Sequence, residues 1–257
     1  MEPVSSPVRS VMQNLDRHIA FTEREHRLIS ALESEPFAVA RGDTLWHPDE
    51  VPRHLYSLHR GWACTLHRSE DDAEQVLDLH LPGDVLGLLD FTFTTHYTTA
   101  EMLTDGVVRA IPIAGIHRLF QAAPRVAMSL QAATARQQRN ITQRLVNVLG
   151  NDACSRIAHF ALEIHHRLAG TGMEVSNRFT LPLTQRRLSQ LLGMSEVHVS
   201  RTLSELAERR LVLRQRQSID ILDFEELARI ANFRPERFSD TLNPAFVGRE
   251  PPTSPDL

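Results

Sequence analysis

The chain has 257 residues, of which 42% are hydrophobic and 23% charged, with a formal net charge of -4. This composition is that of a globular protein, which excludes disorder throughout the chain, and the length suits two modest domains. No apolar run is long enough to cross a bilayer and the N-terminal sequence MEPVSSPVRS lacks the pattern of a secretory signal, so we expect a cytoplasmic protein.

The first 35 residues predict a helical segment. Apolar residues follow a helical period over residues 12–34. Thr22 and Glu25 have the spacing of a capping box around a helix that begins at Glu23.

Residues 36–114 predict an antiparallel β-barrel of the jelly-roll type. Short apolar segments recur between turn sequences such as Arg41-Gly42-Asp43 and Pro82-Gly83-Asp84. Such short, evenly spaced strands are typical of antiparallel barrels. The predicted strands are Phe37–Ala40, Leu55–Leu58, Ala63–His67, Gln75–Leu79, Val85–Leu88, Thr98–Leu103 and Val107–Ile113.

Residues 115–150 predict a dimerisation helix. A short helix ends at Pro124, and a long one runs to about Leu149. One small domain cannot cover a helix of this length, and its second half has the 4-then-3 spacing of a coiled-coil seam. The alternative is that the helix packs only on its own barrel. The predicted interface residues are Leu130, Thr134, Gln138, Ile141, Leu145 and Val148.

Residues 151–233 predict a winged helix-turn-helix domain, followed by an irregular tail over residues 234–257. Asn151 or Asp152 caps a helix over Ala153–Leu168, and two short strands are expected around Ser176–Leu183. With the barrel and the long helix, the fold class is α+β.

The most specific pattern is TQRRLSQLLGMSEVHVSRTLSEL, at residues 184–206. Thr184 can cap a short helix, Gly193 permits a tight turn, and Ser195 can cap a second helix. The face of the second helix opposite its apolar stripe carries Val197 among polar residues, and an exposed valine there has no purpose in folding. A helix-turn-helix by itself is common in helical proteins, so its context decides the interpretation.

The context indicates DNA. Residues 176–217 contain eight arginines and three glutamates, while acidic residues outnumber arginines on either side. Arg201 can bind guanine through two hydrogen bonds, and Val197 can contact a thymine methyl group. A predicted hairpin, Leu211–Leu213 with Ile219–Leu222, places further arginines near the phosphate backbone. The predicted DNA-binding residues are Thr184, Gln185, Arg186, Ser195, Glu196, Val197, His198, Ser200, Arg201, Ser204, Arg214 and Arg216.

The order of these parts resembles the Crp/Fnr regulators, named for the catabolite activator and the fumarate-nitrate regulator. Arg41-Gly42-Asp43 resembles their early barrel turn, and Leu55–Gly61 their strand and turn Y-x-x-x-x-G. Leu81–Gly87 resembles their L-x-x-G-D-x-x-G segment, and Leu183–Leu206 their DNA-binding signature. The resemblance implies a cyclic-nucleotide-binding-like sensor domain and a homodimer that binds a two-fold symmetric operator in double-stranded DNA and contacts RNA polymerase.

Two positions depart from family members that bind cyclic AMP. Those members carry a glutamate and an arginine where this sequence has Leu88 and Thr98. A phosphate that loses its only cation is left unpaired, which costs a few kcal/mol. We therefore predict that the chain does not bind cyclic AMP in the usual way, and its effector is unknown. The candidate effector-pocket residues are Gly83, Leu86, Gly87, Leu88, Leu89, Thr98, Thr99 and Ala100.

The recognition helix also departs from the family. Typical members place a glutamate that pairs with cytosine where this chain has Val197, although Arg201 is kept and Glu196 lies one position earlier. We therefore expect a half-site different from TGTGA or TTGAT.

No resident metal or cofactor is predicted. Residues 1–30 lack the cysteine cluster of oxygen-sensing members, which excludes an iron-sulfur cluster of that type, and Cys64 and Cys154 fit small buried residues. Nine of the thirteen histidines precede residue 120, so haem stays open, although none forms a ligand pair at helical spacing.

Two other classes of function fit these residues less well. A metal-dependent cupin enzyme would need a His-x-His pair with a nearby glutamate, which the strands lack. A partner-binding module that has lost DNA recognition would not need Arg201 and the hairpin arginines in one patch.

Overall fold

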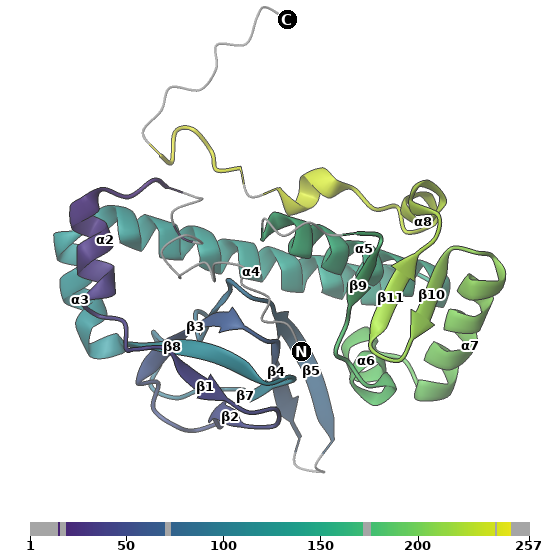
Figure 1. Cartoon of the computed structure of the whole chain (residues 1–257), viewed down its shortest axis with the longest axis horizontal. Helices are drawn as coiled ribbons and strands as arrows, with labels where there is room; N and C mark the ends of the chain where they lie inside the picture. The colour runs from purple at the N-terminus through teal and green to yellow at the C-terminus, as the bar shows by residue number, and fades with distance from the viewer. Residues whose placement is uncertain (1–14, 16–18, 70–72, 172–175, 240, 248–257) are drawn as a thin grey trace, which may run out of the picture.

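A β-barrel, a long central helix and a winged-helix domain follow one another along the chain (Figure 1). The structure is a computed structural model that describes residues 15, 19–69, 73–171, 176–239 and 241–247. The central helix lies over the barrel, and its C-terminal half reaches the winged-helix domain (Figure 1). The predicted α+β architecture is confirmed.

The barrel consists of two antiparallel four-stranded sheets, in the orders β1-β8-β3-β6 and β2-β7-β4-β5. Gly61, between β3 and β4, has φ +91°, and a Cβ atom there would lie 2.7 Å from the carbonyl oxygen of Asp105, so only glycine fits this turn. The strands are β1 (Phe37–Val39), β2 (Thr44–Trp46), β3 (His54–Arg60), β4 (Ala63–Arg68), β5 (Glu74–His80), β6 (Val85–Leu86), β7 (Thr99–Met102) and β8 (Gly106–Pro112).

All seven predicted strands are present, with shifted ends. The eighth, β2, was missed because its three residues lie close to turn sequences on both sides.

The N-terminal capping box is confirmed, and helix α2 (Glu23–Ser30) begins there. The Thr22 hydroxyl accepts a hydrogen bond from the amide of Glu25, and the Glu25 carboxylate accepts one from the amide of Thr22. Residues 12–14 and 16–18 of the predicted helix lie outside the described residues.

Helix α3 (Ile113–Ala122) leads through Pro124 into the central helix α4 (Pro124–Gly150). Pro124 occupies the first turn of α4, where a missing N–H costs little. Val126, Leu130 and Ala133 of α4 pack with Leu55 and neighbouring apolar side chains of the barrel. Part of α4 therefore belongs to the subunit's own core.

The winged-helix domain begins with α5 (Ala153–Gly170), which Asp152 caps by accepting a hydrogen bond from the amide of Ser155. Its sheet has the strand order β10-β11-β9. Of the two strands predicted around residues 176–183, the described residues include one, β9; residues 172–175 lie outside the described residues. The remaining elements are β9 (Arg178–Thr180), α6 (Gln185–Leu192), α7 (Glu196–Glu208), β10 (Val212–Gln215), β11 (Ser218–Ile221), α8 (Phe224–Ile230) and the 3-10 helix η1 (Pro235–Phe238).

The predicted irregular tail, residues 234–257, contains a short helix near its start. Residues Pro235–Phe238 form η1, and Phe238 is buried, with its ring stacked on Phe233 at 5.1 Å between centroids. Apolar burial therefore anchors the chain beyond α8. Residues 240 and 248–257 lie outside the described residues. None of the described helices is both long and apolar enough to cross a membrane.

Candidate nucleic-acid interface

Local capping sets the angle between α6 and α7. The Thr184 hydroxyl accepts a hydrogen bond from the amide of Arg187, and the Ser195 hydroxyl accepts one from the amide of His198. Gly193 ends α6 in the left-handed conformation, with φ 62° and ψ 41°. All three predicted roles are confirmed, and the two helices form a helix-turn-helix.

Helix α7 buries one face and leaves the other open. Val199, Thr202 and Leu206 are buried against the domain core, whereas Val197 is 80% exposed. The exposed face carries a valine, an arginine and several hydrogen-bonding groups, which are the groups that read base edges. The predicted reading residues on this exposed face are Ser195, Glu196, Val197, His198, Ser200, Arg201 and Ser204.

A groove of about 600 Å³ is lined by the start of α6, by α7 and by the hairpin β10-β11. Arg214 lines it and donates a hydrogen bond to the carbonyl oxygen of Leu183 at 2.6 Å, while its Nη1 atom is buried with no acceptor among the described residues. Burial lowers the pKa of the Arg214 guanidinium group. Arg214 therefore brings a partly buried cation to the wall of the groove, which suits an anionic ligand. Six of the twelve predicted DNA-binding residues line this groove: Thr184, Gln185, Ser200, Ser204, Arg214 and Arg216.

Two predicted residues also have partners within the chain. The side-chain amide of Gln185 donates a hydrogen bond to the carbonyl oxygen of Glu196 at 2.9 Å, and so links the starts of α6 and α7. Arg186 is 65% exposed, and its guanidinium lies 3.9 Å from the carboxylate of Glu74.

At the hairpin tip, Arg216 has φ 52°, a left-handed conformation that costs a non-glycine residue about 1 kcal/mol or more.

Within the described residues, neither of two cavities at the barrel contains more than two of the eight candidate effector-pocket residues. Leu86 and Ala100 lie in the apolar interior of the barrel, and the Thr98 hydroxyl lies 3.4 Å from an oxygen of Asp90. Only Gly83 and Leu88 line the cavity between the barrel and α4, which has a volume of about 20 Å³. A cavity of about 330 Å³ elsewhere on the barrel contains none of the eight; it is lined by Leu45, Trp46, Glu50, Val51, Arg53, His54, Tyr56 and His96.

Both structured halves of the chain match family models. Residues 36–123 match the cyclic nucleotide-binding domain, and residues 155–230 match the Crp-like helix-turn-helix domain. The chain belongs to the Crp/Fnr family. It is a DNA-binding transcription regulator of this type, and the cupin enzyme and the module without DNA recognition are not favoured.

Several members of the family are similar along most of this chain. The transcriptional activator protein Anr of Pseudomonas protegens is 24% identical over 191 residues, which cover 74% of this chain and 78% of the relative. A CRP-like cAMP-activated global transcriptional regulator of Mycobacterium tuberculosis is 28% identical over 211 residues, which cover 80% of this chain and 93% of the relative. The solved structure of FixK2 from Bradyrhizobium japonicum superimposes with a TM-score of 0.69 at 25% sequence identity. The match covers 76% of this chain and 96% of the FixK2 chain.

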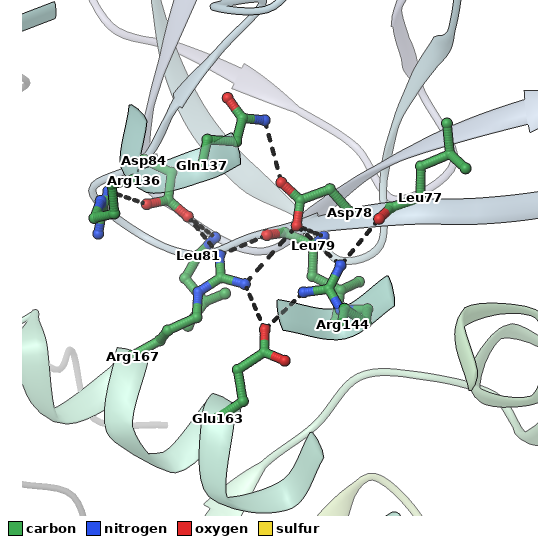
Figure 2. Close-up of polar contacts among 10 residues, drawn as sticks. All are labelled: Leu77, Asp78, Leu79, Leu81, Asp84, Arg136, Gln137, Arg144, Glu163 and Arg167. Atoms are coloured by element: carbon green, nitrogen blue, oxygen red, sulfur yellow. Dashed lines mark hydrogen bonds and ion pairs between the residues drawn. The ribbon is translucent and has the colours of Figure 1, made fainter. Parts of the chain in front are cut away.

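The regulator also contains a buried ion cluster that the sequence analysis missed (Figure 2). Arg144 of α4 is 4% exposed and donates hydrogen bonds to Asp78 of β5 at 3.1 Å and to Glu163 of α5 at 2.7 Å. A third hydrogen bond reaches the carbonyl oxygen of Leu77 at 2.9 Å. Arg144 thereby links the barrel, the central helix and the winged-helix domain.

A second arginine strengthens this link. Arg167 of α5 donates hydrogen bonds to the carbonyl oxygen of Leu79 at 2.6 Å and to Asp84 at 3.1 Å (Figure 2). Arg136 of α4 binds the other oxygen of Asp84 at 2.9 Å. Burial by itself would raise the pKa of Asp84, but the two guanidinium groups outweigh it and hold this pKa at about 2. Asp84 therefore remains ionised near neutral pH.

The predicted dimer interface needs correction. Leu130 is 5% exposed and packs in the subunit's own core, and the Thr134 hydroxyl donates a hydrogen bond to the carbonyl oxygen of Leu130. A Cβ atom added to Gly193 would meet the Val148 side chain at 3.2 Å, so Val148 faces the helix-turn-helix of its own subunit. Gln138 and Leu145 are exposed and Ile141 is half-buried. The exposed row of α4 follows a 3-then-4 spacing: Ala135, Gln138, Thr142, Leu145 and Leu149.

The two cysteines are buried or half-buried thiols. Burial raises the pKa of the Cys64 thiol to about 12, and that of the half-buried Cys154 to about 11, so neither is a ready thiolate. In the part of the chain that the structure describes, no three histidine, cysteine or acidic side chains converge as metal ligands.

Proposed function

We propose that the regulator acts as a homodimer that reads a palindromic operator in double-stranded DNA, with one α7 helix in the major groove of each half-site. The observation that carries this proposal is the open face of α7, where an 80% exposed Val197 lies beside Ser200 and Arg201. A recognition helix places such side chains against base edges, while the preceding helix crosses the phosphate backbone.

Each group on this face suits a particular base. The Arg201 guanidinium can donate two hydrogen bonds to O6 and N7 of guanine, and Val197 can contact the thymine methyl group. Glu196 can accept a hydrogen bond from N4 of cytosine. Since Val197 replaces the glutamate of typical members, the half-site differs from TGTGA or TTGAT.

Phosphate contacts come from the start of α6 and from the hairpin. Thr184 and Arg186 stand at the N-terminal end of α6, where backbone N–H groups also favour an anion. Arg214 and Arg216 line the far side of the groove. Contacts of this kind fix the register of the protein on DNA and make its affinity depend on salt.

Dimerisation places two such faces on one duplex. The exposed row on α4 ends in Leu145 and Leu149, which are 55% and 77% exposed. Its 3-then-4 spacing supports a coiled-coil seam with a second copy of α4. The family relationship also supports a contact with RNA polymerase and a place in the cytoplasm.

The barrel is proposed not to bind cyclic AMP in the usual way. The Thr98 hydroxyl already lies 3.4 Å from the carboxylate of Asp90, so a phosphate at Thr98 would face a negative charge instead of an arginine. Titration calorimetry should detect no binding of cyclic AMP at micromolar concentrations. Sub-micromolar binding that is lost in Thr98→Val would overturn this part of the proposal.

Selection of bound sequences from a random pool of duplexes tests the proposed function. The purified full chain should enrich a sequence with two-fold symmetry, and the variant Val197→Glu should shift the preferred base within each half-site. If the wild type enriches no sequence, the protein does not read DNA as proposed.

A further inference from the structure

The winged-helix domain contacts the barrel directly through α6. The Arg187 guanidinium lies 3.0 Å from one oxygen of Glu101 on β7 and 3.4 Å from the carboxylate of Glu74 on β5. The side-chain amide of Gln75 donates a hydrogen bond to the carbonyl oxygen of Gln190 at the end of α6. Arg187 is only 15% exposed, so this contact is shielded from water more than an ordinary surface ion pair.

The same domain is attached to the rest of the chain elsewhere as well. Barrel side chains such as Leu66 and Leu79 share one apolar core with Ile157 of α5 and Leu191 of α6, and Arg139 of α4 donates a hydrogen bond to the carbonyl oxygen of Ser239 at 3.0 Å. Glu163 and Arg167 of α5 join the buried ion cluster of the barrel and α4, and the chain itself connects α4 to α5 at Asn151 (Figure 2). Apolar contacts are not directional, so they resist separation of the two domains more than a change in their relative orientation. The hydrogen bonds of Arg187 to Glu101 are directional, so they add a constraint on the orientation of α6 relative to the barrel.

This docking leaves the reading face open. Arg187 and Gln190 meet the barrel, whereas Val197, Ser200 and Arg201 of α7 stay exposed. The contact between the barrel and α6 therefore does not compete with DNA for the residues that read bases.

We propose that Arg187, Glu101 and Glu74 are positioning residues, which hold the reading face at a fixed orientation to the barrel and so set the half-site spacing that the dimer accepts. This inference rests on the proposed function. Each added base pair moves one half-site by about 3.4 Å and turns it by roughly 35° relative to the other. A firmly held pair of reading faces should therefore discriminate strongly between spacings, and a loosened pair should discriminate less.

The test compares wild type and Glu101→Gln on duplexes that carry one half-site, two half-sites at the selected spacing, or two half-sites one base pair closer or further apart. In Glu101→Gln the ratio of affinities between the selected and altered spacings should fall by roughly two- to fivefold, the range expected for a partly shielded ion pair. Affinity for the single half-site should stay unchanged. The double variant Glu74→Gln, Glu101→Gln should reduce the ratio further.

Glu226→Gln is the matched control. It makes the same change in net charge but removes an ion pair with Arg229 inside the winged-helix domain, so its spacing preference should equal that of the wild type. If Glu101→Gln weakens binding to all duplexes by one factor, or changes none of them, the positioning role is wrong. A wild type that selects a sequence but has no spacing preference would also overturn it. A wild type that selects no sequence would refute the proposed function, and the positioning role with it.

Discussion

Replacing Arg144 with methionine tests how strongly the buried ion cluster holds the barrel, α4 and α5 together. Methionine keeps an apolar stem but removes three hydrogen bonds, including those at 3.1 Å to Asp78 and 2.7 Å to Glu163. The two carboxylates have side chains only 2% and 1% exposed, so water cannot replace the lost guanidinium. Breaking a buried ion pair from one side costs about 3–5 kcal/mol, and we expect the free energy of unfolding to fall by about this amount.

The assay is urea unfolding at pH 7, followed by the fluorescence of Trp46 and Trp62 in the barrel and by circular dichroism of the helices. Adding Glu163→Gln to Arg144→Met should recover about 1 kcal/mol or more, because a neutral amide replaces a buried charge that would keep only its 3.5 Å contact with Arg167. As a control, Arg229→Met removes an exposed ion pair on α8 and should leave the unfolding midpoint unchanged. A loss below about 1 kcal/mol for Arg144→Met, the value of a surface pair, would refute the reasoning.

Three further predictions concern separate parts of the molecule. Arg216→Asn should leave the protein at least as stable as the wild type, because asparagine tolerates the left-handed conformation at φ 52°. The same variant should lower the salt dependence of DNA binding by about one phosphate contact. An unchanged salt dependence would place this arginine away from DNA. The pKa of Asp84, about 2, lies below its ordinary 3.8, so its contribution of about 2 kcal/mol is present above pH 4 and is lost as the pH falls through 2. Urea midpoints between pH 5 and pH 2 should show this loss in the wild type, and an equal loss in Asp84→Asn would contradict the assignment. The double variant Leu145→Asp, Leu149→Asp should be monomeric by light scattering at concentrations where the wild type is dimeric, and a persistent dimer would place the interface elsewhere.

Local patterns in the sequence were enough to predict the fold. The capping box at Thr22, the turn at Gly193 and the caps at Thr184 and Ser195 depend on residues three or four positions apart, which the sequence displays directly. The exposed valine at position 197 was predicted in the same way, from the period of one short helix.

The ion cluster could not be predicted because its members are distant in sequence. Arg144 and Asp78 are 66 positions apart, and nothing near either residue distinguishes it from a solvent-exposed charge. The barrel contact of Arg187 has the same origin, since Glu101 lies 86 positions away. Pairing of this kind becomes visible only once the domains are packed together.

The error in the dimer seam has a different cause. Helix α4 carries apolar residues on more than one face, and only the packed structure shows that Leu130 faces the barrel while Leu149 does not. Successive residues of a helix are about 100° apart around its axis. Choosing a coiled-coil register that is wrong by one residue therefore assigns side chains of the subunit's own core to the dimer interface.

The affinity of Arg201→Ala for the selected operator and for its single-base variants tests the central claim most directly. The claim predicts a loss of about 1–3 kcal/mol on the operator and a loss of preference at one symmetry-related base pair in each half-site, with other positions unaffected. Arg210→Ala, which removes an exposed arginine beyond the end of α7, should keep the full base preference. An equal loss on every sequence, or no loss at all, would contradict the claim that α7 reads DNA through this arginine.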